Sequence, residues 1–293
     1  MEHRVQFSSD ELTLAGILRV PDGESRQPRP AFIVLHGFGS NKNAGNVMAP
    51  CDLLNSLGYV TFRFDMRGCG DSQGEPGRLI CLEQVSDTRN ALDFLADRPE
   101  VDGAHIAVLG SSFGAAVAVY TAGVDRRVAA VISSGGWGNG ERKFRGQHPT
   151  PEAWGKFTAM LAEGRRHKQQ TGTSLMVPRY DIVPIPEHLR GHVVERSVQM
   201  FPAETAQSMF DFRAEDVVGQ IAPRPLLLLH SSLDSVTPTE QSLGLFAHAG
   251  QPTELHLMAD TDHFMFAEGN TRVRRIVTDW LEKYFPATAA VAV

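Results

Sequence analysis

A serine with a glycine two positions before it and another two positions after it is the first candidate for chemistry in this chain. Residues 110–114 read GSSFG, a G-x-S-x-G pattern that follows an apolar run and precedes an alanine-rich stretch. A sharp turn between a strand and a helix needs small neighbours to lift a serine side chain clear of the backbone. Ser111 does not fit the pattern, because the positions two residues before and after it hold Leu109 and Phe113 and not glycine. The pattern predicts that Ser112 is a nucleophile; the competing interpretation is a helix cap without chemistry.

A serine nucleophile needs a histidine base and an acid that orients it, and after this type of turn they follow in the order acid, histidine. Asp234 comes just after the apolar run 225–229, and His263 follows the run 254–258. If both runs are parallel strands, these residues lie on loops at the carboxyl ends of strands, where such sheets build their sites. We therefore predict that Asp234 and His263 complete a catalytic triad with Ser112.

Other acids and histidines near these positions are weaker candidates. Asp260 and Asp262 are so close to His263 in sequence that we expect at most a supporting role for them. His256 lies inside a predicted strand and His230 at the end of one, just before the acid. For both histidines we expect burial or an orienting role.

The chemistry also requires hydrogen-bond donors for the oxyanion that forms during acyl transfer. One predicted donor is the backbone N–H of Phe113, directly after the nucleophile. The second is the backbone N–H of Phe38 in the segment LHGFG at residues 35–39, where Gly37 and Gly39 let the backbone turn inward. The Phe38 ring would then line the acyl site; otherwise it is an ordinary loop aromatic.

The elements that must position these residues follow a repeated pattern. Short apolar runs, typical of strands buried on both faces of a parallel sheet, alternate with segments of helical apolar spacing. This alternation predicts an α/β fold with a mostly parallel central sheet flanked by helices. The expected strands are 4–8, 13–20, 31–35, 59–64, 106–109, 128–132, 225–229 and 254–258, and the expected helices are 44–57, 82–96, 113–122, 238–247 and 272–284.

The alternation stops near residue 137 and resumes after residue 213, which predicts an insertion that forms a lid on the sheet. The core would then consist of residues 1–136 and 214–286, with a flexible tail at 287–293. The insertion is rich in Met and aromatic residues, and we predict that Trp137, Trp154, Met160 and Met209 contact substrate. The alternative is that these side chains form the core of the lid. The insertion has 11 Lys/Arg against 8 Asp/Glu, which raises a second hypothesis, an anionic substrate.

Composition narrows the class of protein. The chain has 293 residues, 42% of them hydrophobic, enough for one large core. Its net charge of -6 argues against a nucleic-acid partner, and no apolar stretch is long enough for a signal peptide or a membrane span. The three cysteines are too few for a disulfide framework, so we expect a reducing, cytoplasmic location. Whether the chain is a monomer or a homodimer stays open.

These motifs together resemble those of the serine α/β-hydrolase superfamily. Residues 36–39 resemble its HGxG oxyanion loop, and residues 65–72 its D-x-R-G-x-G-x-S loop. Residues 110–114 resemble the nucleophile elbow, residues 234–238 the acid loop, and Asp262-His263 the histidine loop. Within the superfamily, the segments around residues 36–42 and 70–74 are similar to bacterial cinnamoyl/feruloyl esterases and peptidase-S9-like hydrolases.

The resemblance implies an α/β-hydrolase fold and hydrolysis of a carboxylic ester, or in some relatives an amide, without metal or cofactor. A small hydrophobic or aromatic molecule is the expected substrate. Hydrolysis of C–C bonds in β-diketones, thioester hydrolysis and acyl transfer use the same residues and stay open. A rival of another class is a binding protein that keeps the fold but has no activity.

Overall fold

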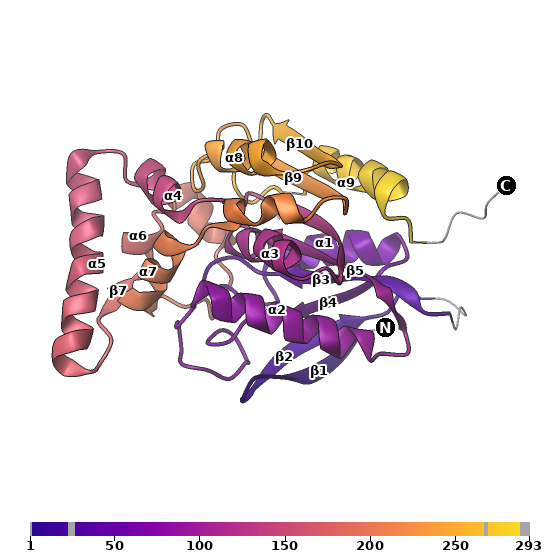
Figure 1. Ribbon diagram of the computed structural model, residues 1–293, viewed down its shortest axis with the longest axis horizontal. Helices are drawn as coiled ribbons and strands as arrows, with labels where there is room; N and C mark the ends of the chain where they lie inside the picture. Colours follow the sequence, from indigo (N-terminus) through magenta and orange to yellow (C-terminus); the bar gives the residue numbers. More distant parts are fainter. Residues whose placement is uncertain (1, 23–26, 267–268, 288–293) are drawn as a thin grey trace.

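The computed structural model describes residues 2–22, 27–266 and 269–287, and its centre is an eight-stranded sheet (Figure 1). The order of the strands across it is β1-β2-β4-β3-β5-β6-β9-β10. The first two strands run antiparallel to each other, and β2 is antiparallel to β4; the other neighbours are parallel. The strands are β1 (Glu2–Ser9), β2 (Leu12–Arg19), β3 (Arg29–Leu35), β4 (Val60–Phe64), β5 (Val101–Ser111), β6 (Val128–Ser134), β9 (Leu226–Ser231) and β10 (Thr253–Met258).

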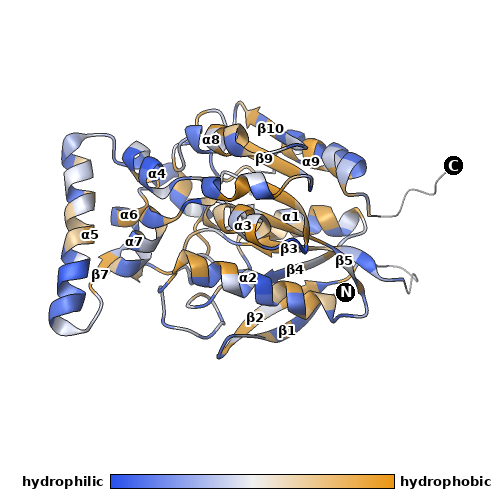
Figure 2. Ribbon diagram, in the orientation of Figure 1, coloured by the Kyte–Doolittle hydropathy of each residue, from blue (hydrophilic) through white to orange (hydrophobic). Residues whose placement is uncertain are grey.

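Two apolar layers lie on the two faces of this sheet. Successive side chains of a strand point to opposite faces, so Ile33 of β3 joins one layer and Val34 the other. Helices α2 (Cys81–Ala96) and α3 (Phe113–Val124) complete the first layer, and α1 (Gly45–Ser56) and α9 (Thr271–Tyr284) complete the second. The strands that both layers cover are the most hydrophobic part of the ribbon in Figure 2. The mostly parallel sheet flanked by helices, predicted from the apolar runs, is confirmed.

Residues 137–213, which we call the inserted region, stand beside the sheet at one end of the molecule (Figure 1). It contains a two-stranded antiparallel sheet of β7 and β8, which α6 and α7 contact. Inside it, the rings of Phe144 and Phe157 stack with their centroids 4.5 Å apart. Its elements are α4 (Gly140–Gln147), α5 (Pro151–Thr171), β7 (Met176–Pro178), α6 (Arg179–Ile182), the 3-10 helix η1 (Glu187–His192), β8 (Met200–Pro202) and α7 (Ala203–Asp211).

The chain returns to the sheet through two short 3-10 helices, η2 (Ala214–Asp216) and η3 (Val218–Gln220), and then continues into β9, α8 (Glu240–His248) and β10.

The predicted strand 106–109 is the middle of the longer β5, which begins at Val101. The predicted tail lies outside the described residues except for Ala287. Among the described residues, none of the helices is both long and apolar enough to cross a bilayer.

Two glycines of α5 provide a test of how this helix packs. A Cβ added at the exposed Gly155 would meet no atom within 4 Å, whereas one at the buried Gly164 would lie 2.3 Å from the Cβ of Ala203. Alanine is favoured over glycine inside a helix by about 1 kcal/mol. We expect G155A to raise the free energy of unfolding by that amount and G164A to lower it, measured by urea denaturation. Equal effects of the two substitutions would contradict this packing.

Candidate active site

Ser112 lies at a strained turn between β5 and α3. Its backbone has φ 56° and ψ −114°, a conformation that non-glycine residues rarely adopt. The chain approaches itself closely here: a Cβ at Gly110 would lie 2.1 Å from the carbonyl oxygen of Gly114, and one at Gly114 would lie 2.6 Å from that of His36. Both positions therefore require glycine, as the G-x-S-x-G pattern predicts. The turn leaves the Ser112 side chain half-buried at the wall of a cavity.

His263 faces the same cavity and is paired with Asp234. The imidazole Nδ1 is 2.8 Å from Oδ2 of Asp234 and 3.1 Å from Oδ1. Oδ1 also accepts hydrogen bonds from the backbone N–H groups of Val236 (2.8 Å) and Thr237 (2.7 Å). These contacts fix the carboxylate and leave Nε2 as the second imidazole nitrogen, the one available to a hydroxyl in the cavity. The structure thus brings the three predicted triad residues to one place.

A second histidine, His230, also contacts the acid. Its side chain is fully buried, and its Nε2 lies 3.3 Å from Oδ2 of Asp234 and 2.9 Å from the carbonyl oxygen of Thr237. A carbonyl only accepts, so Nε2 carries the hydrogen, while Nδ1 faces the Ser242 hydroxyl at 2.6 Å. The orienting role expected for His230 agrees with these contacts.

The electrostatic environment keeps Asp234 ionised. Burial by itself would raise the pKa of this carboxyl. The charge of His263 and the hydrogen bonds from His230 and His263 outweigh burial and hold the pKa of Asp234 far below the usual range for aspartate. An ionised carboxylate at this position accepts a hydrogen bond from Nδ1 of His263.

The candidate oxyanion loop follows β3, and a buried histidine holds it. His36 accepts a hydrogen bond at Nε2 from the backbone N–H of Met66 (3.0 Å), so the ring proton is on Nδ1, which donates to the carbonyl of Gly37 (2.8 Å). Burial lowers the pKa of His36, which agrees with a neutral ring. The backbone N–H of Ser40 donates to the same carbonyl (3.1 Å). The Gly37 carbonyl is thus turned toward His36, which leaves the N–H of Phe38 on the opposite side of that peptide group.

The cavity beside Ser112 lies between the sheet and the inserted region. Its volume is about 30 Å³, room for roughly one water molecule. The core contributes Gly37, Phe38, Ser40, Asn46, Ser112, Val236, His263 and Phe264 to the lining, and the inserted region contributes Arg179, Val183, Ile185, His192 and Val193.

Of the predicted substrate contacts, only Phe38 lines this cavity. Trp137 is buried against Phe212, and Met209 is buried in the same apolar cluster. Trp154 and Met160 pack on that cluster from α5. The structure therefore buries Trp137 and Met209 in the apolar interior and leaves Trp154 and Met160 half-buried against it, with none of the four at this cavity.

Sequence reasoning missed the residues of the inserted region that do line the cavity. Arg179, Val183 and Ile185 lie in a stretch without an apolar period, and η1 adds His192. The larger aromatic and Met side chains were the stronger signal for an apolar pocket, but their size also makes them suited to core packing. No local feature of residues 179–193 marks them as cavity lining.

Lys143 is an unusual member of the interior of the inserted region. Its side chain is 2% exposed, its Nζ lies 4.0 Å from the centroid of the Phe144 ring, and it donates to Oε1 of Gln147 (2.8 Å). No carboxylate of the described residues is within ion-pair distance of it. Burial lowers its pKa to about 7, against the smaller opposite effects of Cys81 and Asp234.

The burial of Lys143 predicts that this side chain destabilises the folded protein by an amount that depends on pH. Between pH 7 and about 10.5 the unfolded chain binds a proton at this lysine that the folded chain does not, so stability falls as the pH decreases through that window. We expect K143M to raise the free energy of unfolding by on the order of 3 kcal/mol at pH 7 and by much less at pH 10. Denaturant titrations at both values measure this, with K156M, a change at an exposed lysine of α5, as the control. A gain that is the same at both values would contradict the prediction.

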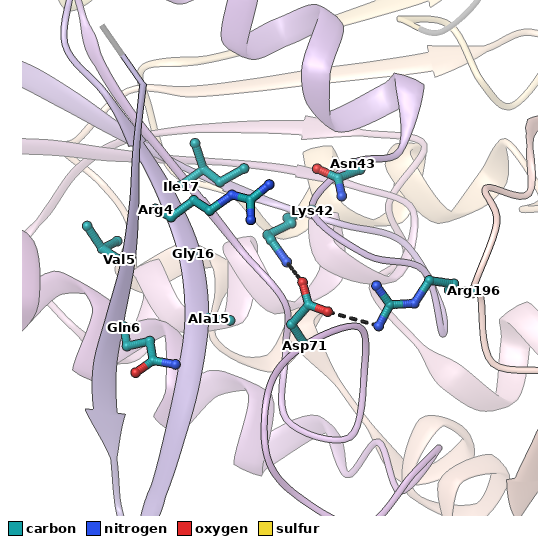
Figure 3. A pocket seen from close by; sticks show the side chains of 10 residues that line it. All are labelled: Arg4, Val5, Gln6, Ala15, Gly16, Ile17, Lys42, Asn43, Asp71 and Arg196. Carbon is teal, nitrogen blue, oxygen red and sulfur yellow. Dashed lines mark hydrogen bonds and ion pairs between the residues drawn. The ribbon is translucent and has the colours of Figure 1, made fainter.

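A larger cavity of about 640 Å³ lies outside this site, between β1, β2 and the loops after β3 and β4 (Figure 3). Its wall carries Lys42, Asp71 and Arg196, joined by ion pairs of 2.7 and 2.9 Å through the carboxylate of Asp71. Lys42 is also paired with the buried Asp65 at 2.6 Å. The two acids thus pair with Lys42 and Arg196, two of the three cations of the wall, the third being Arg4.

Nothing in the described residues is arranged as a metal site, since no group of three or more His, Cys, Asp or Glu side chains could hold an ion. Cys51, Cys69 and Cys81 are free thiols and buried. Burial raises the pKa of Cys51 and Cys81 to about 12, which makes these thiols poor nucleophiles.

The chain matches a hydrolase family over most of its length and is similar to several proteins over nearly all of it. The model of a hydrolase family described as serine aminopeptidase, S33, matches residues 26–270. An uncharacterized 31.7 kDa protein of the traX–finO intergenic region of Escherichia coli is 27% identical over 92% of this chain and 96% of its own. The polyketide transferase grgF of a Penicillium species is 28% identical over 91% of this chain and 90% of its own.

Solved structures agree with this fold. The α/β hydrolase GrgF from Penicillium superposes with a TM-score of 0.80 at 23% identity, covering 97% of this chain and 99% of that one. Est1E from Butyrivibrio proteoclasticus, solved with ferulic acid bound, has a TM-score of 0.67 at 17% identity and covers 95% of this chain and 100% of that one. The predicted α/β-hydrolase fold is therefore confirmed.

Proposed function

The chain belongs to the hydrolase family described as serine aminopeptidase, S33, and on that premise we propose that it is a serine hydrolase that cleaves a carboxylic ester. One observation carries the proposal: Ser112, on a strained turn, shares a cavity with a histidine whose other nitrogen is held by a buried carboxylate. A nucleophile, a base and an orienting acid in this relation are what acyl transfer from an ester requires.

The first half of the reaction forms an acyl-enzyme. Ser112 Oγ attacks the ester carbonyl carbon while Nε2 of His263 takes the hydroxyl proton, and the carbonyl electron pair moves onto oxygen. Asp234 accepts the Nδ1 hydrogen bond throughout and stabilises the positive imidazole. When the tetrahedral intermediate collapses, the C–O bond to the alcohol breaks and His263 returns its proton to the leaving oxygen.

The second half uses the same groups with water. A water molecule attacks the acyl carbon while His263 takes one of its protons. His263 then gives this proton to Ser112 Oγ as the bond between Oγ and the acyl carbon breaks and the carboxylic acid product is released. In both halves the negative oxygen would lie against the N–H groups of Phe38 and Phe113. The N–H of Phe113 is in the first turn of α3, where backbone donors have no partner within the helix. The positive end of the helix dipole also favours a negative charge there.

The wall of the cavity supports a small apolar or aromatic acyl group. Phe38, Val183, Ile185, Val193 and Phe264 present hydrocarbon to the space beside Ser112. The ferulic acid bound to the related fold of Est1E is an aromatic acid of this kind. We assign the inserted region as a lid, because its side chains form part of the wall of the cavity beside Ser112.

Active-site labelling tests this proposal. A fluorophosphonate should phosphonylate Ser112 with loss of fluoride, and peptide mass mapping locates the added mass; a label on another residue would rule out the proposed nucleophile. A panel of p-nitrophenyl esters, thioesters, aminoacyl amides and β-diketones then identifies the bond. We expect the short aliphatic and aryl esters to react fastest, and faster turnover of amides or diketones would reject an esterase.

Acyl transfer to an alcohol is a second candidate, favoured by the similarity to a protein described as a polyketide transferase. The chemistry differs only in the group that attacks the acyl-enzyme. Product analysis with an added primary alcohol separates the two activities, because a transferase gives the new ester in excess over the free acid even at low alcohol concentration.

A further inference from the structure

Phe38 needs outside contacts to hold its amide in one orientation. It lies between two glycines, and Gly39 has φ 53°. Glycine dihedrals are soft, so the peptide groups on both sides of Phe38 turn easily unless hydrogen bonds fix them. On the side of Gly37, the core does this through His36 and Ser40.

On the other side of Phe38, the contacts come from the inserted region. Nη2 of Arg179 donates to the carbonyl of Phe38, and Nη1 is 3.4 Å from the carbonyl of Gly39. The backbone N–H of Val198 donates to that same Gly39 carbonyl (2.8 Å). The Phe201 ring stacks on the Phe38 ring with centroids 4.2 Å apart and planes 18° from parallel.

The packing leaves the loop little freedom to move away from these residues. A Cβ at Gly39 would lie 2.4 Å from the Phe201 ring, so the loop backbone rests directly on that side chain. Farther along, Nδ2 of Asn41 donates to the carbonyl of Glu195 (3.0 Å). Residues 38–41 are therefore held mainly by a segment more than 130 positions later in the chain.

Arg179 suits this task better than another cation would. Its guanidinium is planar and has five N–H donors, and it also donates to the carbonyl of Val198 (2.7 Å). The side chain is 4% exposed, and no carboxylate in the described part of the chain pairs with it. The buried cations Lys42 and Arg63, in contrast, are paired with Asp65 and Glu2. Burying a charge without a charged partner is costly. The buried guanidinium of Arg179 instead hydrogen-bonds carbonyl groups of the loop beside the nucleophile.

We infer that Arg179 and Phe201 are positioning residues for the oxyanion hole. They hold the peptide and the ring of Phe38 so that its N–H stays aimed at the developing oxyanion, and the hole is complete only when the inserted region is docked. The inference rests on the proposed function. Under this inference, the inserted region both covers the substrate and positions a backbone donor of the oxyanion hole.

The test separates transition-state stabilisation from substrate binding. The substrate is p-nitrophenyl butanoate, and the inhibitor is 1,1,1-trifluoro-4-phenylbutan-2-one, whose carbonyl carbon adds Ser112 Oγ to give a hemiketal oxyanion. Loss of a hole donor lowers kcat by about 10²–10³. We expect R179M to lower kcat by about 10²-fold and raise the Ki of the ketone by a similar factor, with KM changed less than three-fold. R179K should fall between R179M and wild type, and F201L should lower kcat by about ten-fold.

The matched control is R166M, which removes an exposed arginine of α5 in the same region; Arg166 pairs with Glu163 of its own helix and does not line the cavity. It should keep wild-type kcat, KM and Ki. If R179M does not fold, R179K and F201L decide. The inference is overturned if R179K and F201L keep kcat within two-fold of wild type, or if the loss is in KM with Ki unchanged. A wild-type protein without esterase activity or ketone binding would overturn the proposed function as well.

Discussion

Replacing Ser112 by alanine is expected to lower kcat for ester hydrolysis by about 10⁶-fold and to abolish fluorophosphonate labelling. The proposed reaction forms its covalent bond at Ser112 Oγ, and losses of about this size follow removal of a serine that acts with a histidine. The fold should persist, because the side chain is half-buried and no hydrogen bond of the described structure ends on its oxygen. Steady-state kinetics of purified S112A against wild type measures the loss.

The neighbouring Ser111 is the matched control. Its hydroxyl accepts a hydrogen bond from Nδ2 of Asn46 (2.8 Å) and is buried away from the cavity. S111A should keep its label and activity within ten-fold of wild type, but lose about 1–2 kcal/mol of stability because the Asn46 donor loses its acceptor. An active S112A beside an inactive S111A would exchange the roles of the two serines and refute the assignment.

Glycine at position 112 tests the backbone strain separately from the chemistry. The positive φ of Ser112 costs about 1–3 kcal/mol in a residue with a Cβ. S112G removes this strain, at an entropy cost of about 0.4–1 kcal/mol, whereas S112A keeps it. We expect both variants to be inactive and S112G to be the more stable by about 1 kcal/mol, measured by thermal or urea unfolding. A less stable S112G would argue against strain at this turn.

Replacing Asp234 by asparagine is expected to lower kcat by about 10⁴-fold, the size of loss found when a triad acid becomes an amide. Asparagine keeps an oxygen for the N–H groups of Val236 and Thr237, but presents an NH₂ group to Nδ1 of His263. The imidazole then accepts at Nδ1 and carries its proton on Nε2, so it cannot take the proton of the Ser112 hydroxyl. The loss should lie in kcat, with substrate binding little changed.

Asp262 provides the control for Asp234. It is also close to His263, but its oxygens accept from the backbone N–H and hydroxyl of Ser235 and from the backbone N–H of His263, with no contact to the ring. D262N should therefore stay within ten-fold of wild-type kcat. A larger loss in D262N than in D234N would identify Asp262 as the acid instead.

D234N should also change how the free energy of unfolding depends on pH. The pKa of Asp234 is lower in the folded protein than the value of about 3.9 in an unfolded chain. Its ionised form therefore stabilises the fold above pH 4, and this contribution is lost as the pH falls below that value. D234N lacks it, so its free energy of unfolding should change less between pH 5 and pH 3 than that of wild type, as acid-unfolding curves can measure.

How far the sequence predicts the site depends on the range of the interactions involved. The strands and helices follow from apolar spacing, and Gly110 and Gly114 follow from one tight turn, so both are readable in short windows. Asp234 and His263 were predicted from their places after strands, because parallel strands bring their carboxyl ends to one edge. The structure brings these residues together with Ser112, while their catalytic roles stay a prediction for the experiments above.

The sequence by itself determined the alternation that builds the sheet and the turn that exposes Ser112, since both arise from contacts between near neighbours and from strand order. Only the tertiary structure decided which side chains close the cavity. Trp137 and Met209 were predicted to face substrate but pack in the interior, because burying a large apolar surface needs only other apolar surface. Arg179 reaches Phe38 across 141 positions of the chain, and that contact depends on how the inserted region folds back onto the loop, which no local pattern encodes.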